Sequence, residues 1–270
     1  MRAWILLVAV CTCLLTGCGA GPTASRPPGR FDSYVAIGDS YTAAPGTGAH
    51  VGPIVCGRSG RNYPRLIAVA LHLARFQDHS CGGATTGDLV RGQHPGLAPQ
   101  IEGLGAATRL VTVGLGVNDA GLFSNFLVRC AKAGPYDPQG APCATAYGPL
   151  DGDRVTWVLG LVREAMVGAL REIVGRAPHA RVLLVGYPQI VPATGRCRQL
   201  PLADKDYPWV RGVLVGLDRA LRSAAATVGV SYIDVWGASA GHDICGADPW
   251  VNGAEGIPGR AAAYHPFEAE

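Results

Sequence analysis

The sequence predicts an α/β fold built on a central parallel sheet. Short, apolar, β-branched runs recur along the chain, and longer segments with helical spacing of apolar residues separate them. Strands that are apolar throughout, rather than alternating, are typical of parallel sheets with helices on both faces. Ligands bind such sheets at the carboxyl ends of the strands, so residues that directly follow a strand are the first candidates for a site.

The expected elements alternate along residues 31–270, which we take as one domain. The expected strands cover 34–38, 109–116, 180–188 and 230–236. The expected helices cover 62–74, 155–177 and 206–229, where apolar residues recur every three or four positions. The Pro/Gly-rich stretch 131–153 is expected to be a long surface excursion.

Residues 1–17 are expected to be an export signal. Arg2 precedes the apolar run AWILLVAVCTCLLTG, which is short for a membrane span of ~20 residues. The run leads into LTGC, which resembles the bacterial lipobox. Cys18 is therefore expected to become the lipidated first residue of a cell-membrane lipoprotein; full secretion through an ordinary signal peptide is the alternative. Residues 18–30, rich in Gly, Pro and Ser, are expected to be a flexible linker.

Charge and cysteine content narrow the function classes. The net charge is only +3 and no Lys/Arg run is present, so the sequence carries no nucleic-acid footprint. Six of the nine cysteines lie beyond residue 30, in the expected domain, and an even number in an exported chain indicates disulfides. Their spacing alone leaves fifteen pairings open. No CxxC or HxxxH spacing occurs in this part of the chain, so no metal site is expected.

Ser40, in GDSYTA, directly follows the first expected strand. A serine at a strand-to-helix turn can act as a nucleophile, because the backbone N–H of the same turn can stabilise the oxyanion that its attack generates. The alternative is a serine that caps a helix. The GxSxG elbow of the α/β-hydrolases is absent.

Two further motifs could complete such a site. CGGATTGDL (81–89) has two glycines that permit close backbone approach to a ligand, or simply a tight turn. GLGVNDAG (114–121) begins like a dinucleotide loop but has Asp119 where glycine is needed. Its Asn118 is more informative, since an amide at a strand end can donate to developing negative charge; its alternative role is a helix cap.

His265 stands near the end of the chain, in AAAYHPFEAE. A lone histidine is more often structural than catalytic, and six others occur in the sequence. His265 becomes a candidate catalytic base only together with the three motifs upstream of it, because a serine nucleophile needs a base to accept its proton.

Ser40, Gly83, Asn118 and His265, in this order, resemble the four blocks of the SGNH hydrolases, also called the GDSL esterase/lipase family. The resemblance covers residues 31–267. DPWVNG (248–253) and the six-cysteine layout are similar to the secreted actinobacterial branch with three disulfides. The resemblance implies a flavodoxin-like three-layer α/β/α sandwich. In that branch the pairing would be Cys56–Cys81, Cys130–Cys143 and Cys197–Cys245.

The resemblance also implies cofactor-free hydrolysis of small-molecule or lipid esters by a monomer. Ser40 would attack the ester carbonyl and His265 would be the general base. The N–H groups of Ser40 and Gly83 and the side-chain amide of Asn118 would form the oxyanion hole. A catalytically silent ligand-binding protein on the same fold is the alternative function.

Two departures from the family pattern bear on the histidine. Many members carry Asp three residues before it, where this chain has Ala262. Because a carbonyl can also accept the Nδ1–H and fix the tautomer, the main-chain oxygen of Ala262 is the expected support. Family members usually continue past HP with a helix that packs on the sheet, whereas only FEAE follows here, so the domain is expected to lack that helix.

Overall fold

The computed structural model describes residues 31–270, and the expected signal, the linker and the lipidation residue Cys18 lie outside the described residues. A five-stranded, all-parallel sheet forms the centre, with the strand order β2-β1-β3-β4-β5. The strands are β1 (Ser33–Gly38), β2 (Arg75–Asp78), β3 (Leu110–Gly114), β4 (Arg181–Val185) and β5 (Ser231–Ile233).

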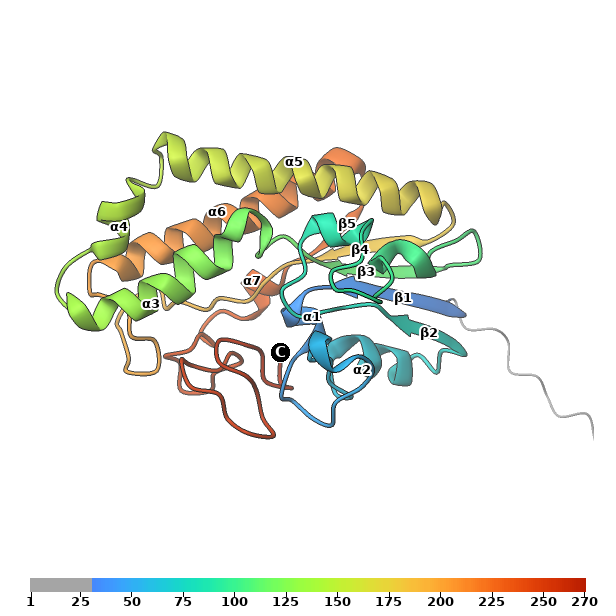
Figure 1. Ribbon diagram of the computed structural model, residues 1–270, viewed down its shortest axis with the longest axis horizontal. Coiled ribbons are helices and arrows are strands. Elements are labelled where there is room, and N and C mark those ends of the chain that lie inside the picture. Colours follow the sequence, from blue (N-terminus) through green and yellow to red (C-terminus); the bar gives the residue numbers. More distant parts are fainter. Residues whose placement is uncertain (1–30) are drawn as a thin grey trace, which may run out of the picture.

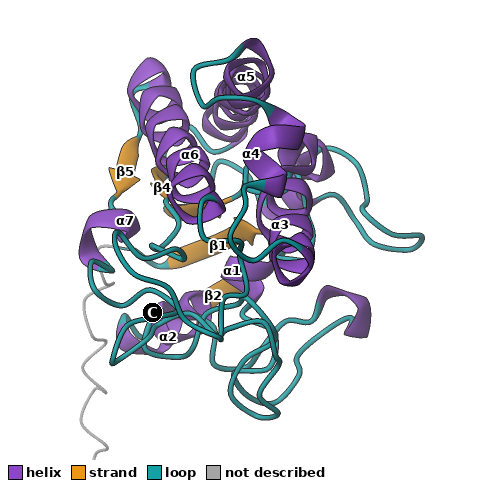
Figure 2. Cartoon of the chain, turned by 90° about the vertical axis from the view of Figure 1, so that its left-hand side faces the viewer, coloured by secondary structure: helices purple, strands orange, loops and turns teal. Residues whose placement is uncertain are grey.

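Helices cover both faces of this sheet, which confirms the predicted fold class. Figure 1 shows the two long helices α5 and α6 on one face and the shorter α2 on the other. The helices are α1 (Ser40–Ala43), α2 (Tyr63–Ala70), α3 (Arg129–Ala133), α4 (Pro142–Tyr147), α5 (Asp153–Arg176), α6 (Asp206–Val228) and α7 (Val235–Ala238). In the view of Figure 2, α5 and α6 lie above β1 and β2, and α2 lies below them.

The pairing of β1 with β3 sets the place of the site. Gly38, the last residue of β1, lies opposite Gly114, the last residue of β3. The segments that carry Ser40 and Asn118 therefore leave the sheet side by side, although they are far apart in the sequence. Parallel pairing of neighbouring strands is what brings two strand ends to one edge.

The main hydrophobic core lies between the sheet and the pair α5/α6. Met166, Leu170 and Ile173 of α5 are fully buried, and Val213 and Leu221 of α6 are fully buried in the same cluster. Burial of such side chains contributes roughly 1.5–3 kcal/mol each. The core thus makes this side of the sheet a firm support for the strand ends.

The opposite face of the sheet is covered less completely. A smaller cluster joins Tyr34, Ala36 and Leu110 of the strands to Ala68 of α2. Beside it lies a cavity of about 410 Å³, lined mostly by apolar side chains of α2, β4 and β5 and by residues 266–270. The end of the chain therefore lies against the sheet, close to α1.

Three parts of the fold differ from the sequence prediction. The expected strand 230–236 ends at Ile233, and its last two residues begin α7. The edge strand β2 was not predicted, and the stretch 131–153 is more ordered than the expected surface excursion because α4 lies within it. Cys130 and Cys143 join α3 to α4 in a disulfide. The other two disulfides are Cys56–Cys81 and Cys197–Cys245, so all three pairs are those that the resemblance implies. Within residues 31–270, no helix has the length and apolar character to cross a membrane.

Candidate active site

Ser40 is the first residue of α1, directly after β1, and Asp39 caps this short helix. The Asp39 carboxylate accepts the N–H of Tyr41 at 2.8 Å, and the Asp39 N–H donates to the carbonyl of Gly114 at 2.9 Å. The turn is tight, since a Cβ on Gly38 would lie only 2.0 Å from the Thr42 hydroxyl. In the part of the chain that the structure describes, the N–H of Ser40 has no acceptor, as expected for the first turn of a helix.

The carboxyl of Asp39 is fully buried beneath this turn. The Tyr187 hydroxyl donates to its second oxygen at 2.5 Å and accepts the N–H of Val117 at 3.2 Å. Burial raises the pKa of Asp39 to about 7, against the lowering effect of these hydrogen bonds. Asp39 and Tyr187 thus connect the Ser40 turn to the segment that carries Asn118.

Gly83 lies in a loop that packs directly against Ser40. Its φ of +76° favours glycine, and a Cβ built on the preceding Gly82 would lie 4.0 Å from the Cβ of Ser40. Two hydrogen bonds shape the loop: Gly82 N–H to the Cys56 carbonyl at 2.9 Å, and Ala84 N–H to the Cys81 carbonyl at 3.1 Å. The Cys56–Cys81 disulfide ties the same two segments covalently.

Asn118 follows β3 and reaches back to the Gly83 loop. Its Nδ2 donates to the carbonyl of Ala84 at 3.0 Å, and no side-chain cap is made to the turn that follows it. One amide hydrogen is used in this bond, and the second is available to another acceptor. The neighbouring Asp119 accepts the Thr86 hydroxyl at 2.6 Å, which holds the two loops together a second time.

His265 lies beside the Ser40 turn, with its ring centroid 5.7 Å from that of Tyr41 and 6.1 Å from that of Phe123. The Nδ1 of His265 lies 2.6 Å from the carbonyl oxygen of Ala263. A carbonyl can only accept, so Nδ1 carries the proton and Nε2 is left free as a base. Burial lowers the pKa of His265, against the opposite effect of this hydrogen bond.

The main-chain support of His265 therefore corrects one expectation. The carbonyl is that of Ala263 and not that of Ala262, whose oxygen accepts the backbone N–H of His265 instead. Tyr264, which lies between Ala263 and His265, has a φ of +61°, a left-handed conformation that turns the chain sharply. This turn places the Ala263 carbonyl under the ring.

The loop that carries His265 is fixed to the Ser40 segment at two points. The Tyr41 hydroxyl donates to the Tyr264 carbonyl at 2.7 Å, and the Ala262 N–H donates to the Pro45 carbonyl at 2.8 Å. Figure 1 shows these late loops, in dark red, beside the blue loop that follows α1. The contacts bring Ser40 and His265 into one site, although 225 positions separate them in the sequence.

Asn252 supports the histidine loop from the other side, and its role was not predicted. Its backbone N–H donates to the His265 carbonyl at 2.9 Å. Its side-chain amide donates to the carbonyls of Glu255, Ala261 and Ala262 at 2.8–3.1 Å. The sequence signal was the motif DPWVNG, which indicated the family branch without indicating this task.

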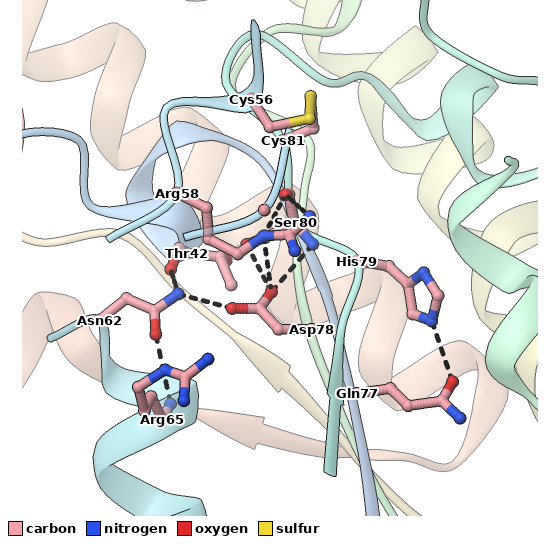
Figure 3. Close-up of polar contacts among 12 residues, drawn as sticks. Thr42, Cys56, Arg58, Asn62, Arg65, Gln77, Asp78, His79, Ser80 and Cys81 are labelled. Atoms are coloured by element: carbon pink, nitrogen blue, oxygen red, sulfur yellow. Dashed lines mark hydrogen bonds and ion pairs between the residues drawn. A yellow bond between two sulfur atoms is a disulfide. The ribbon is translucent and has the colours of Figure 1, made fainter. Parts of the chain in front are cut away.

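A polar network supports the loops from beneath, as Figure 3 shows. Asp78, at the end of β2, accepts the Ser80 hydroxyl at 2.6 Å and the Asn62 amide at 2.7 Å. Asn62 also donates to the Thr42 carbonyl at 3.0 Å, and Arg58 donates to the Ser80 carbonyl at 2.8 Å. The network therefore joins β2, α1 and the segment before α2.

The four residues proposed from the sequence thus lie around one edge of the sheet. Among residues 31–270, no group of three or more His, Cys, Asp or Glu side chains is placed to hold a metal ion. A nucleophile, a base with a fixed tautomer and unoccupied N–H donors are the components of acyl transfer.

Comparison with known proteins agrees with this geometry. The chain is 39% identical over 254 residues to Lipase 2 of Streptomyces coelicolor, covering 92% of this chain and 84% of that protein. The crystal structure of phospholipase A1 from Streptomyces albidoflavus is similar with a TM-score of 0.71 and 28% identity, over 88% of this chain and 94% of that one. The extracellular lipase of Streptomyces rimosus gives a TM-score of 0.69 and 28% identity, over 87% and 93%.

The sequence also matches the profile of the GDSL-like lipase/acylhydrolase family over residues 36–269. This match spans nearly all the described residues and includes each of the four positions named above. The chain therefore belongs to the GDSL-like lipase/acylhydrolase family.

Proposed function

We propose that Ser40 and His265 hydrolyse carboxylic esters through an acyl-enzyme intermediate. Membership of the family, and relatives named lipase, esterase and phospholipase A1, support ester hydrolysis as the reaction class. The observation that carries the assignment is local. The loop of Gly83 packs against Ser40, and its Ala84 carbonyl accepts from Asn118, which supports grouping the N–H of Ser40, the N–H of Gly83 and the Asn118 amide in one oxyanion hole.

In the reaction, Ser40 Oγ attacks the ester carbonyl carbon while Nε2 of His265 accepts the hydroxyl proton. The negative charge on the carbonyl oxygen is stabilised by the N–H groups of Ser40 and Gly83 and by the amide of Asn118. His265 then gives the proton to the leaving alcohol. A water molecule, activated by the same Nε2, hydrolyses the acyl-serine and restores the enzyme.

The base operates as a Ser–His dyad with main-chain support. The Ala263 carbonyl fixes the tautomer and orientation of the His265 ring, which is the positioning task of an aspartate in a triad. A carbonyl has no full negative charge, so it stabilises the imidazolium less than a carboxylate would. Burial keeps the pKa of His265 below its usual value, because the hydrogen bond to the Ala263 carbonyl raises the pKa by less than burial lowers it.

The test is esterase activity on p-nitrophenyl butyrate combined with labelling by a fluorophosphonate. Ser40→Ala should lower kcat/KM by at least about 10³-fold and abolish labelling. Ser223→Ala, at an exposed serine of α6, is the matched control and should retain both. A catalytically silent binding protein would neither turn over the ester nor be labelled. Activity that survives Ser40→Ala would refute the assignment.

For localisation we propose export with a lipid anchor at Cys18. Three disulfides fit an oxidising compartment outside the cytoplasm. If the anchor forms, Cys18→Ala should move the protein from the membrane fraction to the medium of the producing cells. Wild-type protein found in the medium would leave simple secretion as the explanation, and a distribution unchanged by Cys18→Ala would refute the anchor.

A further inference from the structure

The peptide bond between Gly82 and Gly83 decides where one oxyanion donor points. A peptide group is planar and trans, so the N–H of Gly83 points opposite to the carbonyl of Gly82. Both flanking residues are glycines, which accept many backbone conformations at little steric cost. The plane of this peptide is therefore easily turned unless another group holds it.

The neighbouring polar groups of this loop already have partners. The Gly82 N–H binds the Cys56 carbonyl, the Ala84 N–H binds the Cys81 carbonyl, and the Ala84 carbonyl accepts from Asn118. Within residues 31–270, the Gly83 N–H has no acceptor. The contacts around it thus leave this one donor unoccupied, on the loop that packs against Ser40.

The Gly82 carbonyl is held by one side chain from outside the loop. Gln93 Nε2 donates to it at 2.7 Å, and a Cβ built on Gly83 would lie 3.6 Å from the same nitrogen. Because a carbonyl oxygen only accepts, the Gln93 amide must turn its Nε2 and not its Oε1 toward Gly82. The other amide atom, Gln93 Oε1, is buried and has no donor in the described part of the chain. The interaction with Gly82 is therefore what orients this amide.

We propose that Gln93 is a positioning residue, which holds the Gly82–Gly83 peptide so that the Gly83 N–H faces the oxyanion. The inference rests on the proposed function, because it assumes that Gly83 is an oxyanion donor. None of the sequence motifs indicated it. Gln93 lies in a loop beyond the Gly-rich segment, and only the fold brings its amide to Gly82.

The first experiment replaces Gln93 with a side chain of similar size that cannot donate. Loss of a complete oxyanion donor typically lowers kcat by about 10²–10³-fold. Gln93→Leu leaves the Gly83 N–H in place but no longer holds its orientation, so we expect a loss in kcat of about 10–10²-fold with KM little changed. The value of kcat is calculated per active site, and the number of active sites is measured by fluorophosphonate labelling carried to completion. Gln77→Leu, at an exposed glutamine of β2, is the matched control.

The second variant, Gln93→Glu, tests the donor itself. An ionised carboxylate cannot donate to the Gly82 carbonyl, whereas a protonated carboxyl can. The activity of Gln93→Glu relative to the wild-type enzyme should therefore recover as the pH is lowered. A general defect in folding would not produce this recovery, and the ratio removes the titration of His265, which both enzymes share.

The outcomes separate this inference from the proposed function. If Ser40→Ala retains activity, the proposed function itself fails. If Ser40→Ala is inactive but Gln93→Leu keeps a wild-type kcat per labelled site, the role of Gln93 is refuted. A defect confined to KM would refute it as well. Should Gln93→Leu fail to fold, Gln93→Glu decides, and a ratio to wild type that does not change with pH overturns the proposal.

Discussion

Asp39→Asn should stabilise the protein at neutral and alkaline pH and leave it nearly unchanged in acid. The carboxyl of Asp39 is fully buried under the Ser40 turn, and burial raises its pKa from 3.8 in the unfolded chain to about 7 in the folded protein. The folded state therefore keeps a proton that the unfolded chain releases. The associated stability is fully present below about pH 4 and is lost as the pH rises through about 7.

The size of the effect follows from the shift. About three pKa units, at about 1.4 kcal/mol each, correspond to about 4 kcal/mol of unfolding free energy. Asparagine imitates the protonated carboxyl. Its oxygen can accept the Tyr41 N–H, and its amide can donate to the Tyr187 hydroxyl. The variant should thus gain up to about 4 kcal/mol over the wild type at about pH 8.

Urea unfolding with the disulfides intact, followed by tryptophan fluorescence, measures this difference at each pH. Asp151→Asn, at an exposed carboxylate before α5, serves as the control and should follow the wild-type profile. The reasoning fails if the difference between Asp39→Asn and the wild type stays constant between about pH 4 and about pH 8. It also fails if the variant is the less stable protein at the alkaline end.

Three further predictions follow from the backbone and the base. Gly46→Ala should lower the unfolding free energy by roughly 1–3 kcal/mol and lower kcat, because φ at Gly46 is +90° and the new Cβ would lie 2.9 Å from the Ala262 nitrogen. The control Gly105→Ala, in open space, should lower the unfolding free energy much less, as measured by thermal unfolding. Gly168→Ala, exposed within α5 with no atom near its Cβ, should raise the unfolding free energy by about 0.5–1 kcal/mol; a destabilised variant would contradict this. Because burial lowers the pKa of His265, the acid limb of the kcat/KM profile should have its midpoint below pH 6.5. A midpoint above this value would contradict a buried base.

The sheet and its long helices could be predicted because their signals are local. The predicted helices 155–177 and 206–229 correspond closely to α5 and α6, and strand 34–38 to β1. The strand β2 was missed because RFQD contains a single apolar residue. A strand at the sheet edge needs no continuous apolar run, and its side chains alternate between exposed and half-buried.

Only those residues of the candidate site that stand in short sequence motifs could be proposed from the sequence. The four residues are recognisable because each stands in its own short block. The first three along the chain come soon after a strand. The carbonyl that supports His265 is a different matter. It depends on the left-handed conformation of Tyr264, which a tyrosine rarely adopts and which composition does not indicate. Asn252 and Gln93 likewise act through contacts that only the folded chain creates.

The Cys56–Cys81 disulfide has a consequence for when the enzyme becomes active. It joins the segment that supplies a carbonyl to Gly82 with the loop of Gly83, so we expect reduction of this disulfide to loosen the proposed oxyanion hole. Thiols in a bacterial cytoplasm are kept reduced. We expect a newly made chain to be a poor hydrolase there and to gain full activity outside. The cell's own lipid esters would thus be spared during synthesis, by covalent chemistry rather than by a separate inhibitor.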